Sequence, residues 1–298
     1  MSTDFVMDKE NSDKDAVIGY YNGTVAPLSE LMIPALDRAV YFGDGVYDVA
    51  FAVNGVPFAL EDHLDRFERS CALIEMPLPM PRQELKALVY DLLHRLFGEE
   101  KGNGMIYWQA SRATAERTHN YPEGAKSNLM MYVKRKDFPD LEKKVKLITA
   151  EDLRYSLCHI KTLNLIPNVM ANQKAYAAGC DEAILIRDGI VTECSHSSLH
   201  ILKDGKFITH PADCRILPAI SRKHCIELCK ANGIPVEERE FDEKELFSAD
   251  EVLVSSTTTV LRAAGEINGI AVGGKDRALY ERLRGLFVEK IRKETGLC

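Results

Sequence analysis

Short runs of alternating apolar and polar residues recur along the chain, and turn-forming dipeptides separate them. The dipeptides that suit the positive backbone angles of tight hairpin turns are Asn54-Gly55, Asp188-Gly189, Asp204-Gly205 and Asn268-Gly269. The runs 46–53 and 56–60 beside the first turn therefore predict a pair of strands. The later runs predict a four-stranded meander over residues 182–187, 190–195, 199–203 and 206–210. A first strand is expected near Val17 to Tyr21.

Longer segments between these strands show the spacing of an amphipathic helix. Their ranges are 60–76, 82–100, 220–233 and 277–296. In the first segment, Leu64, Phe67, Cys71 and Ile74 fall on one face of the predicted helix. The mixture of antiparallel strands and helices indicates an α+β protein.

The polar segment 135–144 contains a proline and separates two blocks that each combine strands with helices. It is interpreted as a linker between a small N-terminal domain, residues 17–134, and a larger C-terminal domain, residues 145–298. Residues 1–16 are polar and mixed in charge, and they are expected to form a disordered leader. This leader lacks the apolar centre of a signal peptide and the arginine-rich composition of a transit peptide, so a cytoplasmic location is expected.

Composition narrows the class of protein. The 298 residues are 46% hydrophobic and 28% charged, which is typical of a globular protein with a sizeable core. The net charge of -7 argues against nucleic-acid binding, because contact with phosphates needs a basic face. No apolar run approaches the length of a membrane span.

The cysteines and histidines offer two arrangements that resemble metal ligands. The eight cysteines lie mostly in apolar surroundings and are expected to be reduced, buried thiols. Cys225 and Cys229, beside His224, are interpreted as an inward helix face, with a metal or redox pair as the alternative. His196 and His200 are expected to share one face of a strand without converging on an ion. No metal site is therefore predicted.

Lys161 lies in the segment HIKTLNLIPN, which contains no acidic residue. A lysine in a predicted strand is ordinarily solvated, but burial of the amine disfavours its charged form and lowers its pKa. A buried lysine can then act as a nucleophile and a proton carrier, and such lysines form Schiff bases with carbonyl compounds. Lys161 is therefore a candidate catalytic residue.

Several motifs occur in an order that resembles the fold-type IV enzymes that use pyridoxal 5'-phosphate (PLP). They are YFGDGVYDV at 41–49, the segment 159–185 that begins HIKTLNLIPN, and VTECSHS at 191–197. The resemblance spans residues 17 to 290 and implies two α/β domains with the active site at their interface. It also implies that Lys161 carries PLP as a Schiff base and moves the α-proton of the substrate.

The resemblance implies a set of cofactor-binding residues. Glu193 would hydrogen-bond the pyridine nitrogen and keep it protonated, which makes the ring an electron sink. The phosphate would take Arg66, the start of a helix at Ile220 and Ser221, and the hydroxyls of Ser256 and Thr257. Leu217 would pack against the cofactor ring. The alternatives are a surface ion pair for Arg66, with Glu61, Asp62 or Asp65, and an ordinary turn for the serine and threonine run.

The motif R-x-H, formed by Arg117 and His119, resembles the D-amino acid aminotransferases within this group. The resemblance implies that both residues reach from the partner subunit of a homodimer and grip the substrate carboxylate together with Tyr47. D-Alanine and D-glutamate are then the expected donors, with 2-oxoglutarate or pyruvate as acceptor in a double-displacement reaction. A solvated polar loop is the alternative interpretation of Arg117 and His119.

The sequence departs from the family pattern directly after Glu193. Cys194 stands where a glycine or alanine is usual, and His196 adds a titratable group near the cofactor. Three other functions remain open at this point. They are a branched-chain L-amino acid aminotransferase, an aminodeoxychorismate lyase and a non-catalytic PLP carrier.

Overall fold

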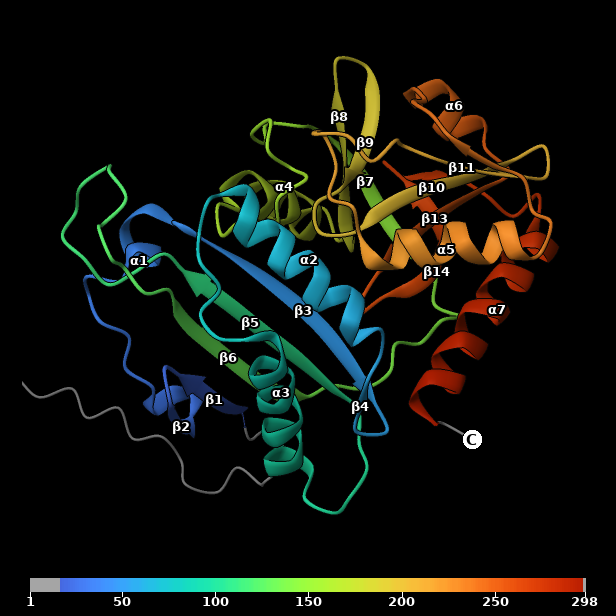
Figure 1. The fold of residues 1–298 in the computed structure, drawn as a ribbon. Coiled ribbons are helices and arrows are strands. Elements are labelled where there is room, and N and C mark those ends of the chain that lie inside the picture. The colour runs from blue at the N-terminus through green and yellow to red at the C-terminus, as the bar shows by residue number, and fades with distance from the viewer. Residues whose placement is uncertain (1–16, 297–298) are drawn as a thin grey trace, which may run out of the picture.

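A computed structural model describes residues 17–296 of the chain. The predicted leader, residues 1–16, lies outside the described residues. The described part contains two sheets with helices packed on their faces (Figure 1). The α+β class predicted from the sequence is confirmed.

The first sheet has six strands in the order β2-β1-β6-β5-β3-β4, and every neighbouring pair is antiparallel. Its strands are β1 (Val17–Tyr21), β2 (Thr24–Pro27), β3 (Gly45–Val53), β4 (Val56–Pro57), β5 (Gly104–Ser111) and β6 (Asn128–Arg135). The helices of this part of the chain are α1 (Arg38–Phe42), α2 (Leu60–Leu73) and α3 (Arg82–Phe97). Helices α2 and α3 cover one face of this sheet (Figure 1).

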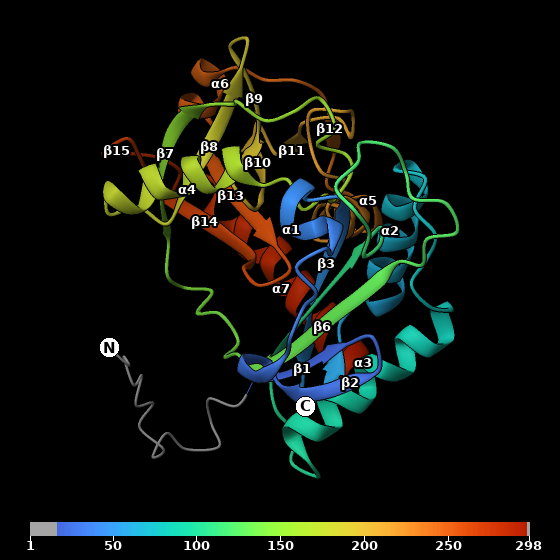
Figure 2. The ribbon, with the colours of Figure 1, turned by 90° about the vertical axis from the view of Figure 1, so that its left-hand side faces the viewer.

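The second sheet has nine strands, in the order β12-β11-β10-β13-β14-β7-β8-β9 with β15 beside β14. The strands are β7 (Val145–Glu151), β8 (Glu182–Arg187), β9 (Ile190–Cys194), β10 (Ser198–Lys203), β11 (Lys206–Thr209), β12 (Val236–Glu238), β13 (Glu251–Ser256), β14 (Val260–Ile267) and β15 (Ile270–Ala271). The helices are α4 (Ile166–Ala177), α5 (Ile220–Ala231), α6 (Glu243–Ser248) and α7 (Arg277–Thr295). Helix α4 packs on β7 and β8, whereas α5 and α7 pack farther along the sheet, on β10, β13 and β14 (Figure 2).

All four predicted hairpin turns form, and each turn residue has a positive φ angle, as at Asn54 (57°) and Gly55 (76°). The predicted four-stranded meander is wrong. Strands β8 and β9 form one hairpin, β10 and β11 form another, and β13, β14 and β7 lie between the two in the sheet. Alternation within a strand specifies a hairpin partner but not which distant strand lies beyond it. The strand expected over 56–60 is also shorter, because Leu60 already begins α2.

Strand β3 connects the two halves of the molecule, because its two faces pack in different hydrophobic cores. Val46, Ala50 and Ala52 pack in the core beneath α2 and α3, whereas Phe51 and Val53 pack against α5 and α7. A strand buried on both faces reads as a nearly continuous apolar run, as GVYDVAFAV does. The space beside β3 therefore lies where the two halves of the molecule meet.

Residues 136–144 form no helix or strand and connect β6 to β7 (Figure 2). The division into domains at this segment stays a prediction. Among the described cysteines, Cys225 and Cys229 are buried thiols on the inward face of α5, but Cys214 is exposed, contrary to the expectation of buried thiols. Within residues 17–296, no helix is long and apolar enough to cross a membrane.

Candidate active site

A cavity of about 760 Å³ opens between the two sheets. Its lining includes Tyr47 of β3 and Arg66 of α2 from the first half of the chain. From the second half come Lys161, Glu193 and Leu217. Segments far apart in the sequence thus meet in one space, as the resemblance implies for an active site between two domains.

Lys161 lies in the loop before α4, so its prediction as a strand residue is wrong. The loop is fixed to β3: the amide of Tyr47 donates to the carbonyl of Lys161 at 2.9 Å, and Leu163 donates to Gly45 at 3.0 Å. A Cβ atom at Gly45 would lie 2.9 Å from the Leu163 side chain and 2.2 Å from a backbone oxygen, so this close approach requires glycine. The amine of Lys161 lies 4.3 Å from the centre of the Tyr47 ring.

Arg66 forms a buried ion pair, but not with the surface acids that the sequence offered as partners. Its Nε and Nη2 donate hydrogen bonds to Asp48 at 2.8 and 2.6 Å. The third nitrogen, Nη1, takes no part in these two bonds. His63 also contacts Asp48, at 2.8 Å from Nδ1. Burial acts to raise the pKa of Asp48, but Arg66 and His63 outweigh burial and hold it well below its usual range. Asp48 therefore stays ionised and holds Arg66 at the wall of the cavity.

Helix α5 begins at this cavity without a side-chain cap. Its N-cap residue is Ala219, whose side chain cannot accept a hydrogen bond from the first amides. Ile220 and Ser221, which begin the helix, both line the cavity. Ser256 and Thr257, at the end of β13, lie in the same lining. An uncapped helix N-terminus with hydroxyls and a guanidinium beside it is suited to a phosphate group.

Glu193 of β9 is buried and accepts hydrogen bonds from Arg154 and from the amide of Leu217, the latter at 3.1 Å. Burial raises the pKa of Glu193, whereas Arg154 and the Leu217 amide oppose this change. Arg154 also donates to Asp152 at 2.8 Å. Burial acts to lower the pKa of Arg154, but the two carboxylates outweigh it, so the guanidinium keeps its charge. The pair fixes one Glu193 oxygen at the cavity wall.

The residues after Glu193 form a turn rather than a continued strand. Cys194 is buried and ends β9, and Ser195 and His196 follow in a bend. Asn172 of α4 contacts the Ser195 hydroxyl at 3.1 Å, and the amide of His196 donates to Glu182 at 2.6 Å. His196 also lines the cavity. The expectation that it shares a strand face with His200 is wrong.

Arg117 and His119 do not line the cavity of their own chain. Both are exposed in the long connection between β5 and β6, and both contact the ring of Phe42. The Arg117 guanidinium lies 4.9 Å from the centre of that ring. Tyr47 and these two residues are therefore not brought together within one chain.

Four charged or titratable residues at the site were not predicted from the sequence: Asp48, His63, Asp152 and Arg154. One signal was present: His63, Arg66 and Ser70 follow each other at helical spacing, and all three are buried on α2. Buried polar side chains on one helix face require partners, which points to a site rather than a core. Nothing in the sequence pairs Arg154 with Glu193, because they lie 39 positions apart.

The chain is similar to known proteins over most of its length. Residues 45–267 match the family model described as amino-transferase class IV. The chain is 36% identical to a D-alanine aminotransferase of Bacillus licheniformis, over 93% of this chain and 98% of the relative. It is 38% identical to a D-alanine aminotransferase of Listeria monocytogenes, over 92% of this chain and 96% of the relative.

The fold is similar to that of a branched-chain aminotransferase of the archaeon Thermoproteus uzoniensis, solved with norvaline. The TM-score is 0.82 at 23% identity, covering 94% of this chain and 98% of the other. At this identity the likeness concerns the fold alone. Because the family model covers most of the chain and the relatives align over nearly their whole length, the protein belongs to the class IV aminotransferases.

Proposed function

We propose that this protein is a PLP-dependent aminotransferase that moves the amino group of a D-amino acid to a 2-oxo acid. The observation that carries the proposal is the joint presence in one cavity of an amine, a phosphate-type anion site and a fixed carboxylate. They come from Lys161, the α5 N-terminus with Arg66, and Glu193. The relatives named D-alanine aminotransferases favour D-amino acids over the branched-chain L-amino acids and the chorismate derivative considered above.

The residues present fit PLP. Nη1 of Arg66, the first amides of α5 and the hydroxyls of Ser256 and Thr257 would hold the phosphate. Leu217 would cover a face of the ring, and Glu193 would accept a hydrogen bond from the ring nitrogen. The buried hydroxyl of Ser198 also lines the cavity and has no hydrogen-bond partner among the described residues. Bound PLP would supply an electron-accepting ring that stabilises negative charge at the substrate α-carbon.

The Lys161 amine has two tasks in this proposal. It would hold the cofactor covalently in the resting enzyme, and Nζ, once released by the amino group of the substrate, would take the proton from the substrate α-carbon and carry it. The hydrogen bond from the Tyr47 amide to the Lys161 carbonyl fixes the loop, so the amine would approach the bound cofactor from one face. Glu193, held by Arg154, would keep the ring nitrogen protonated. After the first oxo acid leaves, a second oxo acid reverses the steps.

The substrate carboxylate would be held by Tyr47 of one chain and by Arg117 and His119 of the partner subunit. The exposure of both residues and their absence from the cavity of their own chain support this division. Exposed apolar side chains nearby, Met32, Leu36 and Val40, support a homodimer. Fixing the carboxylate relative to Lys161 selects which hydrogen of the α-carbon is removed. A cytoplasmic location stays a prediction.

A coupled assay tests the function. Purified holoenzyme is given D-alanine, D-glutamate or L-leucine with 2-oxoglutarate or pyruvate as acceptor, and the oxo acid released is measured. Turnover of the D-amino acids with double-displacement kinetics is expected. Turnover of L-leucine alone would contradict the D-specific proposal, and release of pyruvate from aminodeoxychorismate without an acceptor would favour the lyase. Protein that binds PLP but is inert with every donor would favour the non-catalytic carrier.

A further inference from the structure

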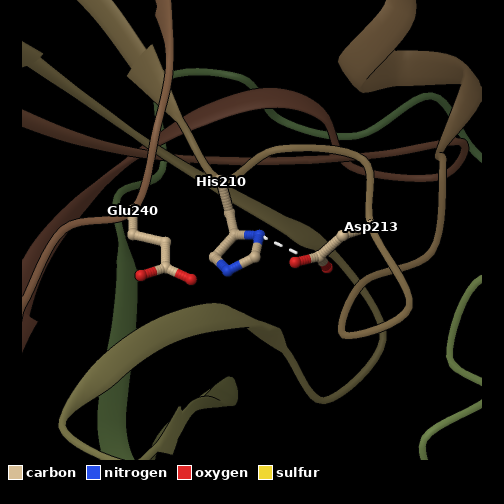
Figure 3. Close-up of side chains that lie close together, drawn as sticks. All are labelled: His210, Asp213 and Glu240. Atoms are coloured by element: carbon tan, nitrogen blue, oxygen red, sulfur yellow. Dashed lines mark ion pairs between the residues drawn. The ribbon is translucent and has the colours of Figure 1, made fainter.

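We propose that His210, Asp213 and Glu240 form a binding site for one divalent transition-metal cation of the zinc type. The three residues lie outside the active-site cavity. His210 directly follows β11, Asp213 lies in the next loop, and Glu240 lies between β12 and α6. Figure 3 shows the imidazole between the two carboxylates. One ligand atom from each residue lies within 4.8 Å of the others.

The protonation of His210 is set by its neighbour. Nδ1 lies 2.9 Å from the carbonyl oxygen of Pro211, which can only accept, so Nδ1 carries the hydrogen. In the neutral ring Nε2 then presents a lone pair. His210 is 1% exposed, and Nε2 has no hydrogen-bond partner among the described residues. A histidine that donates from one nitrogen to a carbonyl and leaves the other free has the usual arrangement of a metal ligand.

The carboxylates supply adjustable ligands beside this ring, and Asp213, whose Oδ1 lies 3.8 Å from Nδ1, must turn toward Nε2 to share a cation with Glu240. The side chains of Asp213 and Glu240 are 39% and 46% exposed, so both can rotate. Ligands of tetrahedral zinc at about 2.0–2.2 Å from the ion stand about 3.4 Å apart, so the carboxylates must move inward by roughly 1 Å. One imidazole with two carboxylates suits zinc and similar ions, whereas Mg²⁺ and Ca²⁺ prefer oxygen ligands alone. Water would complete the coordination.

Arg215 competes with a cation at this site. Its Nη1 donates to Glu240 at 2.8 Å, and its backbone amide donates to Asp213 at 2.8 Å. A bound cation must displace the guanidinium from Glu240. The hydrogen bond from the Arg215 amide orients Asp213 and can remain. Removal of the Arg215 charge should therefore tighten cation binding. Such an increase in cation affinity distinguishes a metal site from a cluster that is held together by Arg215.

Zinc titration of the holoenzyme, without substrate, tests the proposal by calorimetry and equilibrium dialysis. The wild-type chain is expected to bind one zinc ion more tightly than any other. His210→Asn should weaken this step at least tenfold, and so should the exposed double substitution Asp213→Asn with Glu240→Gln, which spares the buried ring. Arg215→Gln should strengthen it. His94→Asn and Glu243→Gln, both on exposed helix positions, are the matched controls and should bind as the wild type does.

Cys214→Ser separates this site from thiol binding, because Cys214 is exposed beside Asp213. Retention of the tight step in Cys214→Ser supports the proposal, and its loss contradicts it. The proposal is also overturned if the wild type binds no zinc, or if both ligand variants bind it unchanged. In either case water, rather than a cation, satisfies Nε2. Catalytic activity is not needed for any of these measurements, so failure of the proposed function leaves this test intact.

Discussion

At the scale of single residues, the central feature is a guanidinium between two buried carboxylates. Arg154 contacts Asp152 and Glu193, and all three side chains are less than 10% exposed. Charges at such depth are tolerated only when each has a partner. Arg154 therefore holds Glu193, the residue proposed to contact the cofactor, in place. No sequence motif predicts this role for Arg154.

Replacement of Arg154 with leucine should strongly destabilise the protein. The change leaves the buried Glu193 without its ion-pair partner and Asp152 with Arg187 alone, and loss of one partner of a buried pair costs about 3–5 kcal/mol. Urea unfolding of the holoenzyme measures the effect. Arg239→Leu is the matched control, because Arg239 pairs with Glu245 at the surface and such pairs contribute about 0–1 kcal/mol. Equal losses in both variants would contradict the prediction.

Asp152 should give the protein part of its sensitivity to acid. Burial acts to raise the pKa of Asp152, but Arg154 outweighs burial and lowers the pKa to about 2, from an ordinary 3.8. The unfolded chain thus binds the proton more readily, and stability falls as pH drops from about 4 to about 2, by about 2 kcal/mol in total. Urea midpoints measured between pH 3 and pH 6 should fall less steeply in Asp152→Asn than in the wild type. The surface variant Asp91→Asn should keep the wild-type slope.

At the scale of elements, the start of α5 is the main candidate for anion binding. Ala219 precedes the helix in an extended conformation, with φ of −72° and ψ of 144°. The first residues of the helix, Ile220 and Ser221, line the cavity, and the N-cap side chain accepts no hydrogen bond from their amides. The predicted start of this helix at Ile220 is confirmed. A substitution at Ile220 can therefore test directly whether a backbone amide contacts the phosphate.

Ile220→Pro should weaken PLP binding by about 10- to 100-fold, because it deletes one amide that would donate to the phosphate, a bond worth about 1.5–3 kcal/mol. Proline suits the first helical position, and the extended Ala219 tolerates a following proline. Ile220→Ala removes a similar amount of side chain but keeps the amide, so it is the control. Cofactor affinity is measured by absorbance during PLP titration. Equal affinity in the two variants would place the phosphate elsewhere.

At the scale of the whole molecule, the residues proposed to bind the substrate carboxylate do not meet within one chain. The cavity holds the proposed catalytic lysine, whereas Arg117 and His119 lie outside its lining. Apolar side chains are exposed around α4 as well, including Ile166, Val169 and Tyr176. A second copy of the chain would cover such surfaces and complete the carboxylate site.

Two inactive variants should therefore restore activity when their subunits are mixed. Lys161→Ala lacks the amine, and Arg117→Ala lacks the carboxylate contact. After random reassociation of equal amounts, about a quarter of all sites should contain both residues, because half of the dimers are mixed and each has one intact site. D-Alanine turnover measures the recovery. No recovery despite proven exchange of subunits would place Arg117 and Lys161 in the same chain.

The chain order of motifs was enough to predict the fold class and the fold-type IV family, and the turn dipeptides were enough to predict the hairpin turns. The helices at 60–76, 82–100, 220–233 and 277–296 were also predicted, to within a few residues, because periodicity is a local property. Local patterns do not contain the order of strands in the second sheet, which is decided by pairing between distant segments. The meander prediction failed for that reason.

By itself, the sequence predicted which side chains would carry the proposed chemistry: the amine of Lys161, the carboxylate of Glu193, and the guanidinium of Arg66 with hydroxyls that suit a phosphate. Only the tertiary structure decided what stabilises them. Asp48 holds Arg66, and Arg154 holds Glu193. The same is true of the cluster around His210, whose members 210 and 240 are 30 positions apart. Electrostatic partnership depends on distance in space and on burial, and neither is encoded by spacing along a chain.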